Sequence, residues 1–106
     1  MSYRYMRVIV FFDLPSVSVV DKREYLKFRK FLLSDGFIMM QESVYSKITL
    51  NMVSADAVKK RIENNKPKTG IVQVLVITEK QFASIDYLCG SAQTTIIDSD
   101  KRLIIF

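Results

Sequence analysis

The sequence contains no histidine and no tryptophan, and its only cysteine is Cys89. Without histidine the chain cannot form histidine-based zinc sites, Ser-His-Asp triads or Cys-His nucleophile pairs. A single cysteine cannot form an internal disulfide, so the expected fold does not depend on an oxidising compartment. No activating base lies near Cys89 in the sequence, and we interpret it as a packing residue rather than a nucleophile. Any chemistry must therefore rest on carboxylates, Lys, Tyr, Ser or water.

Long apolar runs and glycine-rich loops are also lacking. No segment approaches the roughly 18 apolar residues that a membrane span requires. The early apolar run Val8–Phe12 is too short for the core of a signal peptide and stops at Asp13. We therefore expect a cytoplasmic protein with no membrane partner. The glycines Gly36, Gly70 and Gly90 are scattered singly, which disfavours a glycine-rich loop for a small ligand.

Positive charge is in excess, with 16 Lys and Arg against 11 Asp and Glu and a formal net charge of +5. Such an excess favours polyanionic partners, but it also serves solubility, and composition leaves both readings open. The chain has 106 residues, of which 49% are apolar. This length and composition predict a single domain over residues 1–106 whose core forms without disulfide or metal.

Hydrophobic patterning predicts the element order β-α-β-β-α-β, followed by one further strand. Strands are expected at residues 6–12, 37–40, 44–50 and 71–77, and helices at residues 21–35 and 51–65. Asp21 is expected to cap the first helix, Gly36 to follow its end, and Ser54 to cap the second helix. The strands at residues 6–12 and 71–77 are expected to be central and buried. A short helical turn is expected from Thr78 to about Leu88.

This order is the ferredoxin-like plan, an α/β fold of the α+β type with a four-stranded antiparallel sheet and both helices on one face. The other face would leave Phe, Met and Ile side chains exposed to water. We expect a second copy of the chain to cover it, which predicts a homodimer. The C-terminal segment, residues 95–106, ends in the apolar run Leu103–Phe106 and is expected to add a strand at the dimer or partner edge.

Asp13 is the candidate site residue, because it ends a buried strand and precedes a loop and a cationic helix. Position alone favours the other interpretation, a turn aspartate that accepts hydrogen bonds from the amides that follow. One carboxylate is a poor Mg²⁺ site, but Asp13 from two subunits facing one groove could hold a divalent ion. Asp98 and Asp100 form a second carboxylate pair, which we interpret as a polar turn.

Two expected helices carry clusters of basic residues. Candidate nucleic-acid-binding residues are Lys22, Arg23, Lys27, Arg29 and Lys30 on the first helix and Lys59, Lys60 and Arg61 on the second. On the first helix these cations lie opposite an aromatic face. Such faces are often only solvated surface. No base-reading motif is present, so binding would follow the charge and shape of the nucleic-acid backbone with little sequence preference.

Four short strings, taken in order, resemble one protein family. They are Phe12-Asp13 at the end of the first strand, Leu32 to Gly36 at the end of the first helix, Gln41 to Tyr45 in the hairpin, and Ile77 to Phe82 after the fourth strand. The ordered set resembles the Cas-two family of small CRISPR-associated adaptation proteins, the partners of the Cas-one integrase. The string Phe28 to Leu33 looks most like the branch that accompanies Cas-nine (type II) systems.

The resemblance implies a homodimer with Asp13 as catalytic residue and metal ligand at the interface, and with Mg²⁺ or Mn²⁺ as cofactor. It implies metal-dependent endonuclease cleavage of RNA or double-stranded DNA. It also implies a role in spacer acquisition, in which the dimer bridges the Cas-one integrase and supports duplex DNA. The alternative is a ferredoxin-like regulator that binds a small metabolite, for which a glycine-rich ligand loop would be expected.

Overall fold

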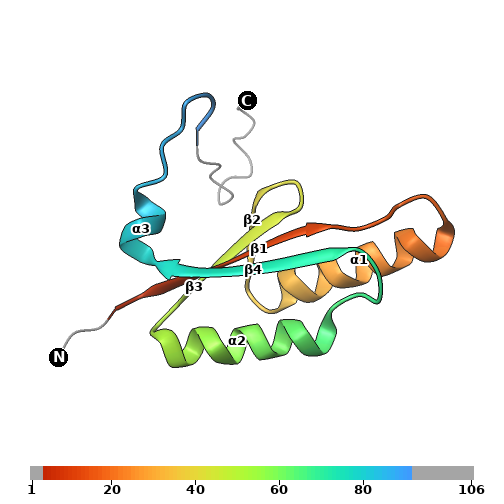
Figure 1. Ribbon diagram of the computed structural model, residues 1–106, viewed down its shortest axis with the longest axis horizontal. Helices are drawn as coiled ribbons and strands as arrows, with labels where there is room; N and C mark the ends of the chain where they lie inside the picture. Colours follow the sequence, from red (N-terminus) through yellow and green to blue (C-terminus); the bar gives the residue numbers. More distant parts are fainter. Residues whose placement is uncertain (1–3, 92–106) are drawn as a thin grey trace.

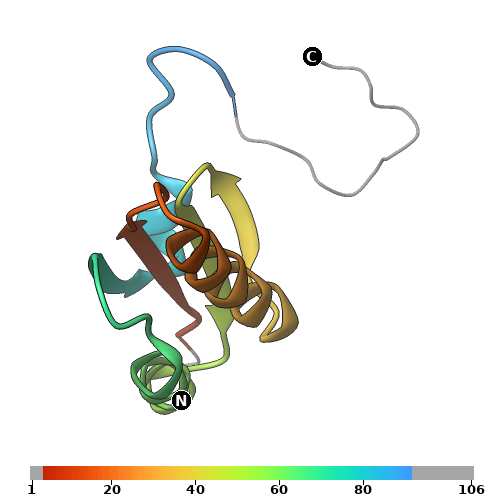
Figure 2. The ribbon, with the colours of Figure 1, turned by 90° about the vertical axis from the view of Figure 1, so that its right-hand side faces the viewer.

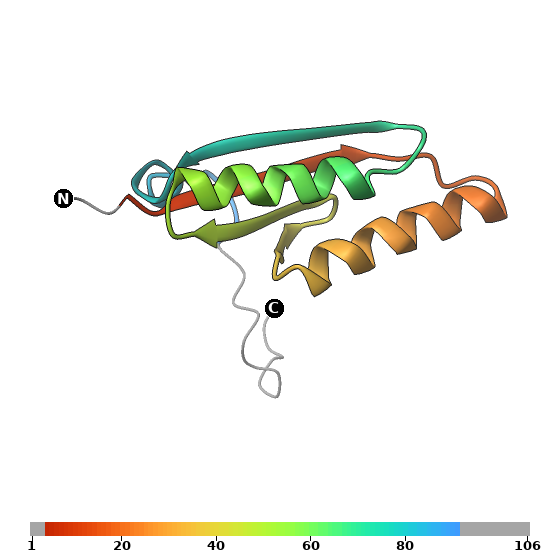
Figure 3. The ribbon, with the colours of Figure 1, turned by 90° about the horizontal axis from the view of Figure 1, so that it is seen from below.

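The computed structural model describes residues 4–91, which form a four-stranded sheet of order β2-β3-β1-β4 with antiparallel pairings. The elements are β1 (Met6–Asp13), α1 (Val19–Ser34), β2 (Ile38–Gln41), β3 (Val44–Thr49), α2 (Met52–Asn65), β4 (Ile71–Thr78) and α3 (Glu79–Ala83). Both long helices cover the same face of the sheet (Figure 1, Figure 3). The predicted ferredoxin-like fold is confirmed. The expected strand in residues 95–106, with Asp98 and Asp100, lies outside the described residues.

The two faces of β1 differ because successive side chains of a strand point to opposite sides of the sheet. Val8, Val10 and Phe12 are buried beneath the helices and belong to the core. The register places Val10 between Tyr45 of β3 and Val74 of β4, so neighbouring strands contribute to the same core layer. The helices complete this layer with their buried stripes, which include the predicted residues Phe28, Leu32, Ala55, Val58 and Ile62.

Both long helices begin at a cap three positions before the predicted one. Ser18 caps α1: its hydroxyl accepts a hydrogen bond from the amide of Asp21 at 3.0 Å, and the Asp21 carboxylate accepts one from the amide of Ser18 at 3.2 Å. This reciprocal capping box puts Asp21 three residues inside the helix boundary. Asn51, rather than Ser54, caps α2, because its side-chain oxygen accepts from the Ser54 amide at 2.9 Å.

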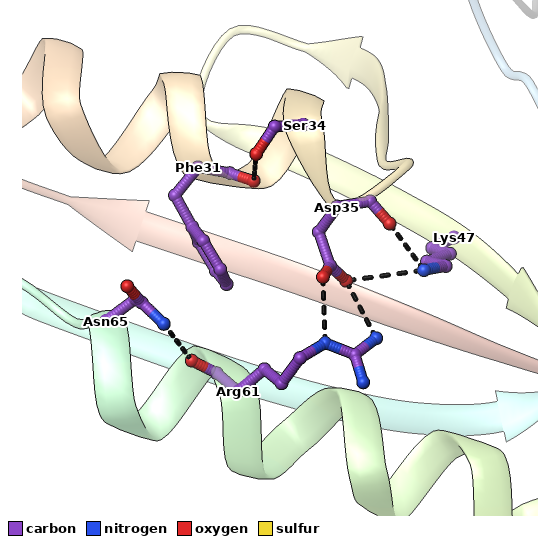
Figure 4. A network of polar contacts seen from close by, with 6 residues as sticks. All are labelled: Phe31, Ser34, Asp35, Lys47, Arg61 and Asn65. Atoms are coloured by element: carbon purple, nitrogen blue, oxygen red, sulfur yellow. Dashed lines mark hydrogen bonds and ion pairs between the residues drawn. The ribbon is translucent and has the colours of Figure 1, made fainter.

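The end of α1 is the predicted glycine stop. Gly36 has φ +102°, and its amide donates to the carbonyl of Leu33 at 3.1 Å. The amide of Phe37 donates to the carbonyl of Leu32 at 3.0 Å, and both of these side chains are buried. This paired arrangement is a Schellman motif, in which a left-handed glycine satisfies carbonyl groups that the helix leaves unpaired. It turns the chain sharply and fixes Asp35 beside β3 and α2 (Figure 4).

Strand β4 pairs only with β1 among residues 4–91, which corrects the prediction of a second central strand. Val72, Val74 and Val76 pack against the core, whereas Ile71 and Leu75 on the opposite face are exposed. The unbroken apolar run therefore consists of one core-facing set and one outward-facing set of side chains. Its sequence resembles a strand buried on both faces because the outward set is apolar too.

The sheet face away from the helices leaves apolar side chains uncovered, as predicted. Ile38 and Ile48 are exposed on it together with the outward residues of β4. Residues 84–91, which follow α3, lie on the side of the sheet opposite α2 (Figure 2) and border an open cleft of about 880 Å³. Helix α3 ends at Ala83, earlier than expected, and Cys89 is exposed, so its interpretation as a packing residue is wrong. No described helix is long and apolar enough to cross a membrane.

Candidate carboxylate site and nucleic-acid interface

The position of Asp13 is fixed by the residue that precedes it. Phe12 is buried, and its ring packs edge-on against Phe28 and Tyr25, with centroid distances of 5.2 and 5.9 Å. It also stacks on Tyr45 at 5.6 Å. Because neighbouring strand residues point to opposite faces, this anchor directs Asp13 away from the helices. Asp13 is exposed there as the last residue of β1.

The turn between β2 and β3 holds one side of this strand end. The amide of Phe12 donates to the carbonyl of Ser43 at 3.1 Å. Ser43 has φ +68°, a left-handed conformation that costs a residue with a side chain about 1–2 kcal/mol. The surrounding hairpin therefore holds Ser43 in this conformation. The carbonyl of Ser43 in turn fixes the backbone of Phe12, next to Asp13.

Gly70 lies directly against the other side of the strand end, where Asp13 pairs with Ile71. Gly70 has φ +92°, and a Cβ atom on it would lie 2.8 Å from the carbonyl oxygen of Asp13 and 2.7 Å from Cδ2 of Leu14. Only glycine fits both the conformation and the space. The loop 66–70 is therefore held against Asp13, and it brings Lys66 and Lys68 to this end of the sheet.

Lys66 and Lys68 were not among the residues that the sequence predicts for the site. The sequence does mark them as part of a basic turn between the second helix and the fourth strand. Their loop ends beside Asp13 because of the antiparallel register of β1 and β4, which sets the end of one strand next to the start of the other. The ferredoxin-like order, followed through to its strand pairing, was the signal that could have located them.

Asp13 is a single carboxylate, and residues 4–91 contain no group of three acidic or cysteine side chains able to hold a metal ion. Such a carboxylate fits a Mg²⁺ or Mn²⁺ ion that keeps most of its water ligands and takes phosphate oxygens as well. It does not fit a cage made wholly by one protein chain. The predicted pairing of Asp13 across a twofold axis stays a prediction.

The basic residues predicted on α1 lie on the side turned away from the core. Lys22, Arg23, Lys27 and Lys30 are exposed, and Arg29 is half-buried. Among the described residues none of these five joins an ion pair. Their charges therefore face solvent on the outer side of the helix layer, which is the position that contact with a polyanion requires.

Arg61 differs from Lys59 and Lys60, although all three are exposed on α2. Its Nε and Nη2 donate to the carboxylate of Asp35 at 2.8 and 3.1 Å (Figure 4). Lys47 of β3 donates to the same carboxylate at 3.3 Å and also to the carbonyl of Asp35. Arg61 therefore ties α2 to the end of α1, and its planar donor fork is already occupied.

Two cations control the ionisation of Asp35. Partial burial opposes the charged form, but hydrogen bonds from Arg61 and Lys47, together with their positive charges, outweigh it and lower the pKa of Asp35 from its ordinary value of 3.8. The hydrogen bond to Asp35 in turn raises the pKa of Arg61. The network is thus an ionised link between three elements, and it is most stable when Asp35 is charged.

Comparison with known proteins bears on this arrangement. The family described as CRISPR associated protein Cas2 matches residues 6–85. The chain belongs to the Cas2 family. Several curated relatives are named CRISPR-associated endoribonuclease Cas2. The relative from Treponema denticola is 48% identical over 94% of this chain and 99% of its own. A relative from Streptococcus mutans serotype c is 50% identical over 93% of this chain and 91% of its own. A relative from Acidovorax ebreus is 51% identical over 80% of this chain and 83% of its own.

The four strings that resemble the Cas2 family include residues that make contacts between elements of the fold. Phe12 meets the hairpin string through its stacking on Tyr45 and its hydrogen bond to Ser43. In the last string, Glu79 forms a two-pronged ion pair with Arg7, at 2.9 Å from Nε and 2.5 Å from Nη2. The Arg7 guanidinium also lies 4.1 Å from the ring centre of Phe82. These contacts fasten α3 to β1 at the end of the sheet opposite Asp13.

We predict that Gly70→Ala destabilises the chain far more than Gly90→Ala. Both glycines have positive φ, so alanine carries a similar conformational cost of about 1–2 kcal/mol at either position. Only at Gly70 does the new Cβ also come within 3 Å of a backbone atom, the carbonyl oxygen of Asp13, whereas no described residue lies within 4 Å at Gly90. Urea unfolding of the two variants measures the difference. Equal midpoints would show that the loop is not held tightly against Asp13.

We predict that Asp35→Asn lowers the free energy of unfolding by about 1–2 kcal/mol at neutral pH, because Arg61 and Lys47 lose a charged partner. In the native protein the folded-state pKa of Asp35 lies below the unfolded value, so its contribution is present above about pH 4 and disappears as the pH falls through the folded pKa. Denaturant midpoints measured at several pH values should therefore fall less steeply for the variant than for the wild type as the pH drops below about 4; this fall is called the acid limb. Asp56→Asn on the exposed face of α2 is the control, and an identical acid limb in all three proteins would contradict the assignment.

Proposed function

We propose that this Cas2-family chain is a CRISPR adaptation subunit with metal-dependent endonuclease activity, in which Asp13 is the catalytic residue. The proposal is carried by the similarity to the Treponema denticola endoribonuclease, which extends over 94% of this chain and 99% of that protein. The exposed, firmly anchored carboxylate at the end of β1 supports it. The substrate class is nucleic acid, either RNA or double-stranded DNA.

In this mechanism the carboxylate of Asp13 would hold Mg²⁺ or Mn²⁺. Such an ion supplies charge neutralisation at a phosphate and a more acidic water for hydrolysis. The residues of the chain position this carboxylate, because the anchor at Phe12 and the close contact with Gly70 hold the backbone of Asp13 in place. A homodimer would contribute a second Asp13, and the uncovered apolar face of the sheet supports such pairing.

The outward basic residues support a second part of the role, contact with duplex DNA during spacer acquisition. The exposed lysines and arginines of α1, with Lys59 and Lys60 of α2, form the proposed contact surface. They can follow the phosphate backbone without reading base sequence. In this proposal the dimer bridges the Cas-one integrase and supports the DNA, and cleavage is a separate property of the same chain.

Replacement of Asp13 by asparagine should abolish cleavage while leaving the fold intact. The side chain keeps its size at an exposed position but loses the charge that attracts a divalent ion. The measurement is cleavage of labelled RNA and duplex DNA with Mg²⁺, with Mn²⁺ and with excess chelator. Asp86→Asn, a change at another exposed aspartate, should cut like the wild type.

The chelator and the two variants distinguish cleavage by this protein from cleavage by a contaminating nuclease. Cleavage that survives in Asp13→Asn, with its thermal unfolding unchanged, would remove Asp13 from the mechanism. Cleavage that persists in excess chelator would exclude a divalent ion. Gel filtration of each variant reports whether the oligomeric state has changed.

Duplex binding should weaken steeply with salt. Each phosphate that a cation neutralises contributes about 0.9 to the slope of log affinity against log salt on B-form DNA. The double variant Lys27→Gln/Lys30→Gln should therefore lower the magnitude of this slope by about 1.8 if both cations contact phosphates. Fluorescence anisotropy of a short duplex measures it. An unaltered slope in this variant would exclude the outer side of α1 as the binding surface.

A further inference from the structure

We propose that Lys68, in the loop between α2 and β4, binds a backbone phosphate within a few nucleotides of the bond that is cleaved at Asp13. This inference rests on the proposed nuclease function and adds a positioning residue to it. It concerns the end of the sheet at which β1 stops and β4 starts. The helix cations predicted from the sequence do not include this residue.

The loop is held in register with Asp13 by two independent features. The antiparallel pairing of β1 and β4 sets Ile71 opposite Asp13. Gly70 packs so closely on the carbonyl of Asp13 that no side chain would fit there. The start of the loop is stiffened as well, because Pro67 has a fixed φ and is half-buried. The lysine between Pro67 and Gly70 is therefore carried on a backbone with little freedom relative to the carboxylate.

Lys68, rather than Lys66, is the residue with an uncommitted charge. The ammonium of Lys66 donates to the carbonyl of Glu63 at 3.3 Å, which folds its side chain back over the end of α2. Lys68 is exposed and takes part in no ion pair or side-chain hydrogen bond with the other residues of 4–91. A phosphate oxygen is a suitable partner for such an ammonium group.

The reach of the loop matches the spacing of phosphates. Paired residues of neighbouring strands lie about 5 Å apart between Cα atoms. Three further residues add at most about 11 Å, so the backbone of Lys68 lies within about 16 Å of that of Asp13. Phosphates along one DNA strand are about 3.4 Å apart in rise, so the flexible side chain can contact a phosphate within a few nucleotides of the carboxylate.

Within residues 4–91, the other charges leave this position without another suitable cation. The side chain of Asp13 points away from the helices, whereas the basic residues predicted from the sequence lie on the helices. On the sheet face shared with Asp13, Arg7 is at the far end of β1 and is paired with Glu79. A substrate that contacts only the outer sides of α1 and α2 would lack a cation beside the reacting phosphate. Lys68 supplies one from the end of the sheet.

The test compares Lys68→Ala with Lys80→Ala, Lys68→Arg and the wild type. Lys68 and Lys80 are exposed lysines that flank the two ends of β4, so Lys80 is a matched control for loss of one charge. The probes are a labelled single-stranded RNA and a labelled DNA duplex, each with Mg²⁺ or Mn²⁺. For the probe that the wild type cleaves, kcat and KM are determined separately. Binding is measured in the Asp13→Asn background as a function of salt.

Lys68→Ala should reduce kcat at least about tenfold, because a misplaced phosphate loses a charge-assisted contact in the transition state. Lys68→Arg should restore most of it, and Lys80→Ala should match the wild type. In the Asp13→Asn background, loss of Lys68 should also lower the magnitude of the salt slope by about 0.7–0.9. Unchanged thermal unfolding excludes a structural cause.

Three outcomes would overturn the inference, and they are distinguishable. Equal kcat in Lys68→Ala and Lys80→Ala removes Lys68 from the site while the nuclease proposal stands. Weaker binding with unchanged kcat places the Lys68 contact away from the bond that is cleaved. A wild type that cleaves neither probe with either ion overturns the proposed nuclease function and the inference with it.

Discussion

Burial of Phe12 among Tyr25, Phe28 and Tyr45 is the constraint on which the candidate site depends. Strand side chains alternate with a period of two, so a slip of one residue would expose Phe12 and drive Asp13 into the core. Such a slip loses aromatic packing and buries an uncompensated carboxylate, and both effects oppose it. The hydrophobic core thus determines where the charged group lies. The contacts from Ser43 and Gly70 then hold the backbone on either side of it.

The fold divides the basic residues into two groups with different roles. Arg7, Lys47 and Arg61 form the ion pairs found among residues 4–91, and each joins elements that are distant in sequence. The lysines and arginines on the outer sides of α1 and α2 take no part in such pairs, apart from Arg61. The formal charge of +5 therefore does not measure the charge available to a partner. The positive charge available to a partner depends on which cations are unpaired at the surface, because the paired cations are already neutralised by carboxylates of the same chain.

Much of the fold could be predicted from the sequence, because apolar periodicity and stop signals are local. The buried stripe through Val58 and Ile62 and the glycine stop at Gly36 were found in this way. The edge position of β4 was not, since Ile71 and Leu75 are apolar although they face outward. For the site, the position of Asp13 was predictable from the end of an apolar run. The pairing of Arg61 with Asp35 and the nearness of loop 66–70 to Asp13 were not, because both arise from tertiary packing.

The pairing of the sheet has a consequence for the order in which the chain can fold during synthesis. Strand β1 leaves the ribosome first, yet its partners are β3, where Thr49 pairs with Met6, and β4, where Thr78 pairs with the same residue. Until those strands emerge, β1 is an apolar segment with unpaired backbone groups on both edges, a state prone to aggregation. Helix α3 has only five residues, too few to be stable alone, and it is fastened to β1 by contacts between Arg7 and Glu79. The first of the four strands to be made therefore completes its pairing only when the last of them, β4, has been made.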